Sequence, residues 1–247
     1  MSGGPNDRLT STDSTTASRR QGFDWPHALV ELATVVVGIL IALAINNWAQ
    51  ARHDAVLEAR YLDRLLADSS ENLTMLQERI DWHTRRANTF ARLNKWLTNE
   101  TQPPTDDEIS DVLCRWFMQP ALRVRRETYA ELVSTGNLSL LRDVPLRGLL
   151  GEAEARHEES LRLDRFLDTL RRVAEPLNQY RQWEIDSNSR FGVGCHFDLK
   201  GMRSDPAIPS IFAQLYRDQT LNRSFREQEL AAVRAVHDRI IKLHSER

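Results

Sequence analysis

The sequence has few helix-breaking residues and no large excess of charge of either sign. Its 247 residues include 10 Gly and 9 Pro, and neither type occurs between Ala49 and Thr101. This scarcity excludes collagen-like and low-complexity chains, and strand-like alternation is nearly absent. The 33 basic and 35 acidic residues leave a net charge of −2, so no basic field directs the whole chain to nucleic acid. We therefore expect an all-α protein without a nucleic-acid partner.

Cysteine is also scarce. Only Cys114 and Cys195 occur, and their spacing matches no metal-binding motif. The even count permits one disulfide if this part of the chain is exported, and two reduced, buried thiols are the alternative. The sequence predicts neither a metal ion nor another cofactor.

One long apolar run stands out against these absences. The 18 residues 28–45 contain one charged residue, Glu31, and one other polar residue, Thr34. As a helix with a rise of about 1.5 Å per residue, this run is about 27 Å long, close to the ~30 Å of hydrocarbon in a bilayer. Trp25 and Trp48 bracket it, and indole rings favour the headgroup layers. The pattern predicts a single-pass transmembrane helix.

Three regions follow from this prediction. Residues 1–24 form a polar, disordered tail, residues 25–48 the transmembrane helix, and residues 49–247 a helical bundle domain. Two processing signals are competing interpretations. The pattern Ala42–Ala44 suits a signal peptidase, although it lies inside an unbroken helical run, and Ser18–Arg20 matches a twin-arginine signal only in part.

The charges beside the span bear on its orientation. Arg19 and Arg20 precede it, so the positive-inside rule favours a cytoplasmic N-terminus and residues 49–247 outside. Three arginines follow the span at a similar distance and weaken this argument: Arg52, Arg60 and Arg64. We expect the N-terminus inside and the domain outside.

Several residues of the span have alternative interpretations. Glu31 lies about one turn inside the edge, where it can reach headgroups, and ion or proton handling is the functional alternative. Gly38 and Ala42 form a small-xxx-small pair that allows two helices to approach closely. Asn46 and Asn47 stand beside Trp48 at the membrane exit. They either satisfy interfacial polar groups while the indole anchors the helix, or bind headgroups or a partner.

A helical stripe continues beyond the span. Stepping by four and three residues from Leu62 to Leu97 gives eleven positions, eight of them apolar, which predicts one long amphipathic helix. Charged residues such as Arg64, Glu78 and Arg92 fall off the stripe. The stripe positions are Leu62, Leu66, Ser69, Leu73, Leu76, Ile80, His83, Ala87, Phe90, Asn94 and Leu97.

The rest of the chain also reads as helices. A capping box at Thr105 and Glu108 predicts a helix that ends near Pro120. Gly136 and Asn137 form a helix-breaking turn, in which Gly136 can end a short helix in a left-handed cap and Asn137 tolerates positive φ.

Two further long helices complete the prediction. Asp143 caps a helix over 144–177, antiparallel to the first, with Pro145 in its first turn. Residues 184–209 read as irregular, and a last helix covers 210–244. Its inner face is predicted to carry Ile211, Leu215, Leu221, Phe225, Val233, Val236, Ile240 and Leu243.

Candidate sites in this domain are weak. His83 and His157 could share a metal site with Glu154 or Glu158 if their helices face each other, but core histidines are the more ordinary interpretation. Cys195 precedes His196, yet adjacency in sequence does not position a base, and a disulfide with Cys114 explains Cys195 better. The cluster Arg123, Arg125 and Arg126 could meet phosphates or an acidic partner, although a solvated face is more common.

Two blocks resemble a known family. The run ELATVVVGILIALAINNW followed by ARYLDRLLADSSENL resembles the N-terminal signature of an uncharacterised bacterial single-pass inner-membrane family, and TYAELVSTGNLSLLRDVPLR resembles a second motif of that family. The resemblance covers about 28–76 and 126–150. It implies an inner-membrane anchor with a helical portion, and no chemistry. The matching residues of the first block are Glu31, Gly38 to Leu43, Ile45 to Trp48, Tyr61, Leu62, Leu65, Asp68 and Asn72.

Together with this resemblance, the sequence favours a non-enzymatic, single-pass protein of the bacterial inner membrane with a periplasmic helical domain. It would contact the lipid bilayer and act through an unknown protein partner or as a homo-oligomer. The alternative is a membrane-tethered sensor or signalling adaptor whose bundle binds a small ligand. A hydrolase using His83, His157 or Cys195 is a more distant hypothesis.

Overall fold

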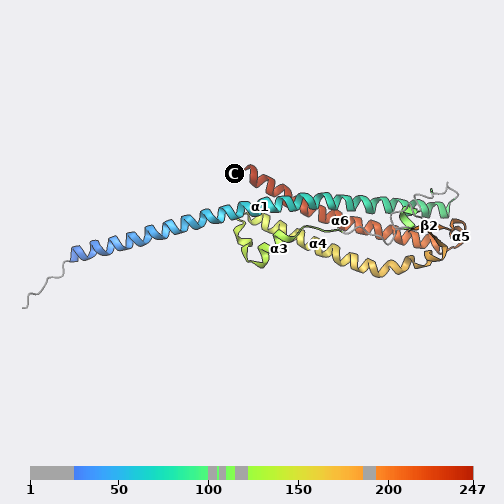
Figure 1. Ribbon diagram of the computed structural model, residues 1–247, viewed down its shortest axis with the longest axis horizontal. Helices are drawn as coiled ribbons and strands as arrows, with labels where there is room; N and C mark the ends of the chain where they lie inside the picture. Colours follow the sequence, from blue (N-terminus) through green and yellow to red (C-terminus); the bar gives the residue numbers. More distant parts are fainter. Residues whose placement is uncertain (1–24, 100–104, 106–109, 115–121, 186–192, 247) are drawn as a thin grey trace, which may run out of the picture. The chain divides into compact units, whose positions relative to one another are not determined.

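The computed structural model describes residues 25–99, 105, 110–114, 122–185 and 193–246. Its fold is all-α with one small hairpin, and the chain divides into two compact units, Met1–Arg52 and His53–Arg247 (Figure 1). The α-helices are α1 (Trp25–Thr98), α3 (Glu127–Ser134), α4 (Val144–Leu170), α5 (Leu199–Ser204) and α6 (Ile208–Ser245). The shorter elements are the π-helical turn η1 (Ser110–Cys114), the 3₁₀ helices η2 (Asn137–Leu140) and η3 (Arg171–Tyr180), and the strands β1 (Arg181–Ile185) and β2 (Val193–Phe197).

The first unit contains the apolar part of α1. Every side chain described from Leu29 to Arg52 is exposed, including the apolar ones. The hydroxyl of Thr34 donates to the carbonyl of Val30 at 2.8 Å, so this polar group is satisfied within the helix. This is one helix long and apolar enough to cross a membrane, and its apolar window is not buried. A core helix of a soluble domain would bury that window, so the protein has one candidate membrane-spanning helix near its N-terminus.

The second unit is a bundle of three long helices: α1 from His53 onward, α4 and α6. Leu62 of α1 clusters with Leu146 near the start of α4 and with Ile240 near the end of α6. Phe90, near the end of α1, clusters with η3, which follows α4, and with Phe212 near the start of α6. Hence α4 runs parallel to α1, and α6 runs antiparallel to both (Figure 1). The predicted antiparallel arrangement of the first two long helices is therefore wrong.

The parallel arrangement requires the chain to return along α1 before α4 begins. Residues 122–126, the connecting segment, make this return without regular structure. The side-chain amide of Asn72 holds it in place. Its Nδ2 donates to the carbonyl of Arg125 at 2.9 Å, and its Oδ1 accepts from the Arg125 backbone N–H at 2.7 Å. One buried amide thus satisfies both backbone groups of Arg125, as a neighbouring strand would.

Local signals of the sequence are confirmed around α3 and α4. Gly136 has φ of 72°, the left-handed conformation that ends α3, and Asn137 begins η2. Asp143 accepts the backbone N–H of Leu146 at 2.7 Å and caps α4, whose second residue is Pro145.

Other boundaries differ from the prediction. The helix predicted over 144–177 is α-helical only to Leu170, because Pro176 has no N–H and its ring would clash with the carbonyl four residues earlier. The stretch predicted to be irregular contains the antiparallel hairpin β1–β2 and the helix α5. Most of the helix predicted from Thr105 lies outside the described residues, and η1 is the part that the structure gives.

Candidate functional site: a polar layer in the bundle core

The side chains in the core of the helical unit are apolar in some parts of the bundle and polar in another. One apolar cluster surrounds Leu62, Leu146 and Ile240, and another surrounds Phe90 and Phe212 at the opposite end of the bundle, while a smaller cluster at Leu76, Ile80, Leu230 and Val233 lies along α1 and α6 between them. Between the two end clusters, each helix contributes polar side chains to the interior, and we call this set the polar layer. Its members are Arg79, His83 and Arg86 of α1, His157, Ser160 and Asp164 of α4, and Gln219, Asn222, Arg226 and Glu229 of α6. Eight of these ten are buried, and the other two, Asp164 and Gln219, are bonded to a buried partner. Charged groups rarely occupy such positions unpaired.

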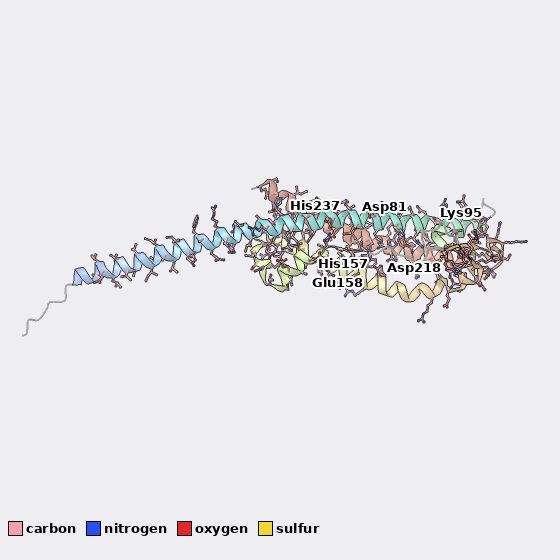
Figure 2. All side chains as sticks on the ribbon, viewed as in Figure 1. Asp81, Lys95, His157, Glu158, Asp218 and His237 are labelled. Carbon is pink, nitrogen blue, oxygen red and sulfur yellow. A yellow bond between two sulfur atoms is a disulfide. The ribbon has the colours of Figure 1, made fainter. Side chains whose placement is uncertain are left out.

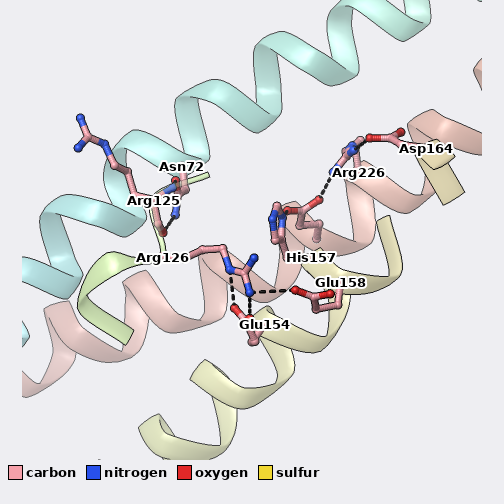
Figure 3. A network of polar contacts seen from close by, with 9 residues as sticks. Asn72, Arg125, Arg126, Glu154, His157, Glu158, Asp164 and Arg226 are labelled. Atoms are coloured by element: carbon pink, nitrogen blue, oxygen red, sulfur yellow. Dashed lines mark hydrogen bonds and ion pairs between the residues drawn. The ribbon is translucent and has the colours of Figure 1, made fainter. Parts of the chain in front are cut away.

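A continuous chain of contacts joins α4 to α6 in this layer (Figure 3). The Nδ1 atom of His157 lies 2.6 Å from Oε1 of Glu229. The other carboxylate oxygen of Glu229 accepts from Arg226 at 2.7 Å, and Arg226 also donates to Asp164. Each helix contributes two residues to this chain of contacts, His157 and Asp164 from α4 and Glu229 and Arg226 from α6, and every buried charge in it has a partner.

The position of Glu229 affects its protonation. Its side chain is 0% exposed, and burial alone would raise the pKa of the carboxyl. The hydrogen bond with His157 and the positive charge of Arg226 outweigh burial, so the pKa of Glu229 lies below its ordinary value. Glu229 is therefore a carboxylate at neutral pH and fixes the orientation of the His157 ring.

His83 belongs to the same layer but has a different environment. Its side chain is 1% exposed, and its Nδ1 lies 2.8 Å from Oε1 of Gln219. Its Nε2 is buried and has no hydrogen-bond partner among the described residues. Burial lowers the pKa of His83 to about 4, and the charges of Arg79, Arg226 and Arg86 act in the same direction. His83 is therefore a neutral imidazole at neutral pH.

The arginines beside His83 also respond to burial. Burial and the charge of Arg226 lower the pKa of Arg79 to about 10, so its guanidinium remains charged at neutral pH. Arg86 donates to the carbonyl of Val112 at 3.0 Å, and its guanidinium lies 4.5 Å from the centre of the Trp82 ring. The α1 side of the layer is thus positively charged.

A small cavity of about 60 Å³ borders the polar layer. His157 and Glu229 lie in its wall together with Tyr129 and apolar residues of the three long helices. Arg126 of the connecting segment also lines it and binds both Glu154 and, at 2.9 Å, Glu158 of α4. These contacts raise the pKa of Arg126, with the Glu154 hydrogen bond as the largest cause. A volume of about 60 Å³ corresponds to about two water molecules.

The structure does not bring the proposed metal ligands together. His83 contacts Gln219, His157 contacts Glu229, and Glu154 and Glu158 both contact Arg126. Within the described ranges, no group of three or more His, Cys, Asp or Glu side chains is arranged to hold a metal ion. Figure 2 labels two of the proposed ligands, His157 and Glu158, which lie next to each other on α4.

Cys195 is joined to Cys114 in a disulfide, with the two Cα atoms 5.9 Å apart. The bond ties β2 to η1, and Cys195 therefore has no thiol to act as a nucleophile. His196 points to the other face of the hairpin and lies 2.9 Å from Glu184. The hypothesis of a Cys–His nucleophile is wrong for this disulfide-bonded form.

The residues predicted to anchor the span lie along α1. Glu31, Asn46, Asn47 and Trp48 are exposed, and the guanidinium of Arg52 lies 6.0 Å from the centre of the Trp48 ring. The backbone of Trp25 begins the helix, whereas its side chain lies outside the described residues.

The small-residue pair predicted in the span is open on its surface. A Cβ atom added to Gly38 would meet nothing within 4 Å, and Ala42 is exposed. The pair therefore leaves a shallow face on which a second helix could pack closely.

Of the basic cluster, two arginines are engaged in ion pairs. Arg125 lies 2.8 Å from Glu71, and Arg126 binds α4 as described. Arg123 and Arg125 are exposed, as a solvated face predicts, whereas Arg126 is only half-exposed and lines the cavity.

The two sequence blocks that carry the family resemblance contact each other. Glu131 of α3 accepts from the Tyr61 hydroxyl at 2.9 Å and from Arg64 at 2.7 Å. Glu58 accepts the backbone N–H of Arg142 at 2.8 Å. These contacts hold the two blocks together in the fold, a role that their resemblance to the family's motifs did not indicate.

The fold and this site define an all-α protein with one candidate membrane-spanning helix and a polar layer inside its bundle. Comparisons of the chain with protein-family models, with curated proteins and with solved structures find no match. The resemblance to the inner-membrane family stays a prediction.

The sequence analysis missed most of the polar layer. It placed His83 and His157 on inner faces, and both are buried. It assigned Leu221 to the inner face of α6, but that side chain is 37% exposed, while Asn222 beside it is buried. A signal was available. From Leu215 to Val233, steps of four and three pass through Gln219, Asn222, Arg226 and Glu229, so polar residues hold four successive core positions.

Proposed function

We propose that this chain is a single-pass protein of the bacterial inner membrane, with a cytoplasmic N-terminus and a periplasmic helical domain. It acts through contacts with a protein partner or with a second copy, and not as an enzyme. The observation that carries the proposal is the apolar stretch of α1, whose side chains are exposed all round. Such a surface is stable in lipid and costly in water.

The disulfide supports the periplasmic placement of the domain. Disulfides persist in the periplasm and are rare in the cytosol of most bacteria. Cys114 and Cys195 are 81 residues apart and lie on separate elements, so only the folded domain brings them together. A periplasmic domain agrees with Arg19 and Arg20 on the cytoplasmic side of the span.

Two exposed surfaces support action through contacts. Gly38 and Ala42 offer the small-residue face for a second transmembrane helix. On the hairpin, Ile185 is 93% exposed and Trp183 is 51% exposed. Aromatic side chains are enriched where proteins bind proteins, and the isoleucine adds exposed apolar surface beside the tryptophan.

Topology is the first experiment. In a C114S/C195S background, a single cysteine is introduced at the exposed Ser139, and intact cells are treated with a membrane-impermeant thiol reagent after the outer membrane alone is permeabilised. We expect labelling at Ser139→Cys and protection at the matched Ser11→Cys, which lies on the other side of the span. The reverse pattern would place the domain in the cytoplasm and contradict the proposal.

The native disulfide provides a second readout. Thiols are blocked by rapid alkylation in cells, and peptides are then analysed by mass without reduction. The proposal expects a linked pair that contains Cys114 and Cys195. Full alkylation of both thiols in otherwise wild-type protein would contradict the periplasmic placement, because the cysteines would then be reduced in the cell.

Self-association through the span can be tested separately. Gly38→Ile should reduce crosslinking between copies in membranes, since the larger side chain separates the helices. Ala33→Ile is the matched control, because position 33 lies on a different face of α1. Equal crosslinking in wild type and G38I would contradict self-association through this face. The proposed contacts would then be with a protein partner.

A second candidate function is a membrane-tethered sensor. The polar layer favours it, because buried charges and a cavity in the core of a bundle are a stability cost that a purely structural domain can avoid. α1 contributes to this layer and also contains the apolar stretch. Ligand-dependent thermal stabilisation of the full-length protein would favour the sensor.

A further inference from the structure

His83 takes no part in the partner contacts or the membrane placement proposed above, yet it is among the most buried polar residues of the domain. The hydrogen bond between its Nδ1 and Gln219 crosses from α1 to α6. If Gln219 accepts this bond with Oε1, the proton of the neutral ring is on Nδ1 and the lone pair is on Nε2. The buried Nε2 faces no hydrogen-bond partner among the described residues.

The charged groups around His83 are mainly positive. From α1, Arg79 and Arg86 act on it, and from α6, Arg226 does. The polar layer contains two carboxylates, Glu229 of α6 and Asp164 of α4. Both are bound by Arg226, and Glu229 also holds His157 of α4.

A proton on Nε2 would therefore enter a site with no acceptor for it and with like charges around it. The free-energy cost of this buried charge destabilises the closed packing of α1 against α6. When the two helices separate, the ring is exposed to water and the cost disappears. We propose that His83 is an acid-responsive element, whose protonation loosens the packing of α1 against α6 at the polar layer. The proposal goes beyond the contacts proposed above and holds on whichever side of the membrane the domain lies.

The size of the effect follows from linkage. The folded-state pKa of His83 is lowered to about 4, against an ordinary value of 6.5. The opened state therefore binds more protons, and the closed state is fully favoured only above pH 6.5 and loses stability as the pH falls towards 4. Between pH 7.5 and pH 5, this difference raises the opening equilibrium constant about 30-fold.

The experiment measures hydrogen–deuterium exchange of full-length protein in detergent micelles at pH 7.5 and pH 5, corrected for the intrinsic pH dependence of exchange. The amides of interest are those near His83 on α1 and near Gln219 on α6. Wild type should show the 30-fold rise in opening there. His83→Asn keeps a donor in place of Nδ1 and removes the titrating group, so its opening should change by less than about threefold.

Two further variants make the result decisive. His53→Asn removes an exposed histidine of α1 and should keep the wild-type pH response. Gln219→Glu places a carboxylate beside His83, which favours the protonated ring, so the response should vanish or reverse. An equal pH response in wild type and H83N would overturn the proposal, and so would an unchanged response in Q219E if H83N failed to fold.

Discussion

Two regions of this chain depart from the usual distribution of side chains in opposite ways. The apolar stretch of α1 exposes valine, leucine and isoleucine all round, whereas the helical domain buries arginine, glutamate and histidine. In water, both arrangements cost free energy. The first cost disappears if the surrounding medium is lipid, and the second is reduced only by pairing the buried charges with one another.

The difference teaches where each region obtains its stability. The apolar stretch depends on its surroundings, and the hydroxyl of Thr34 within it makes its hydrogen bond inside the helix. The polar layer depends on specific partners, because Glu229 is stable in the core only while His157 and Arg226 contact it. A change of solvent would therefore affect the first region, and a change of one side chain would affect the second.

The largest effect is expected from breaking the polar layer. Glu229→Leu leaves Arg226 and His157 in the core without their shared carboxylate, and we expect a loss of about 3–5 kcal/mol in the free energy of unfolding. Chemical denaturation of the full-length protein in micelles measures it. The exposed Glu227→Leu is the matched control and should stay within about 0.5 kcal/mol of wild type. Equal effects of the two changes would mean that the layer contributes nothing specific.

The next largest effect is expected from the apolar stretch. Val37→Asp places a carboxylate near the middle of the candidate span, which should disfavour insertion by about 3 kcal/mol. Membrane fractionation should then show part of the protein in the soluble fraction. Val56→Asp is the control, because the Val56 side chain is about half-exposed and lies on the part of α1 that belongs to the helical domain. It should leave fractionation unchanged. If V37D remained fully in the membrane, this stretch would not be the anchor.

A smaller effect should come from an ion pair outside the layer. Asp143 caps α4 and binds Arg239 of α6, and the hydrogen bond from Arg239 lowers its pKa. Asp143→Ala should cost about 1 kcal/mol through the lost cap. Because the folded-state pKa of Asp143 is lowered, its contribution is present above its ordinary pKa and disappears as the pH falls through the folded-state value. Asp143→Asn retains the capping oxygen, so it should cost less and show no such pH dependence.

The smallest effect concerns the cavity beside the layer. Ala153→Val should fill part of the 60 Å³ space and raise the free energy of unfolding by up to about 1 kcal/mol. Ala155→Val, exposed on the same helix, should lower it by about 0.5 kcal/mol through helix propensity alone. Destabilisation by A153V beyond that of A155V would indicate that ordered water occupies the cavity.

Much of the fold could be predicted from local patterns. The stripe from Leu62 to Leu97 identified the buried face of α1, and Gly136 and Asp143 marked a helix end and a helix start. These features depend on residues close in sequence, since periodicity and capping act within a few turns.

The direction of α4 and the polar layer could not be predicted in the same way. The direction of α4 reflects contacts between residues far apart in sequence, such as that between Asn72 and Arg125, which are 53 residues apart, and nothing local indicates that they meet. The layer was missed because inner faces were recognised by apolar residues. Arg226 and Glu229 occupy core positions only because His157 and Asp164 lie opposite them on another helix.

The contact of Asn72 with the connecting segment has a consequence for how the chain tolerates substitution. The buried amide holds Arg125 against α1, and α3, η2 and α4 follow from that point. An amide donates with its nitrogen and accepts with its oxygen, whereas a carboxylate can only accept. Asn72→Asp, although almost the same in shape, would therefore leave the Arg125 carbonyl without its donor.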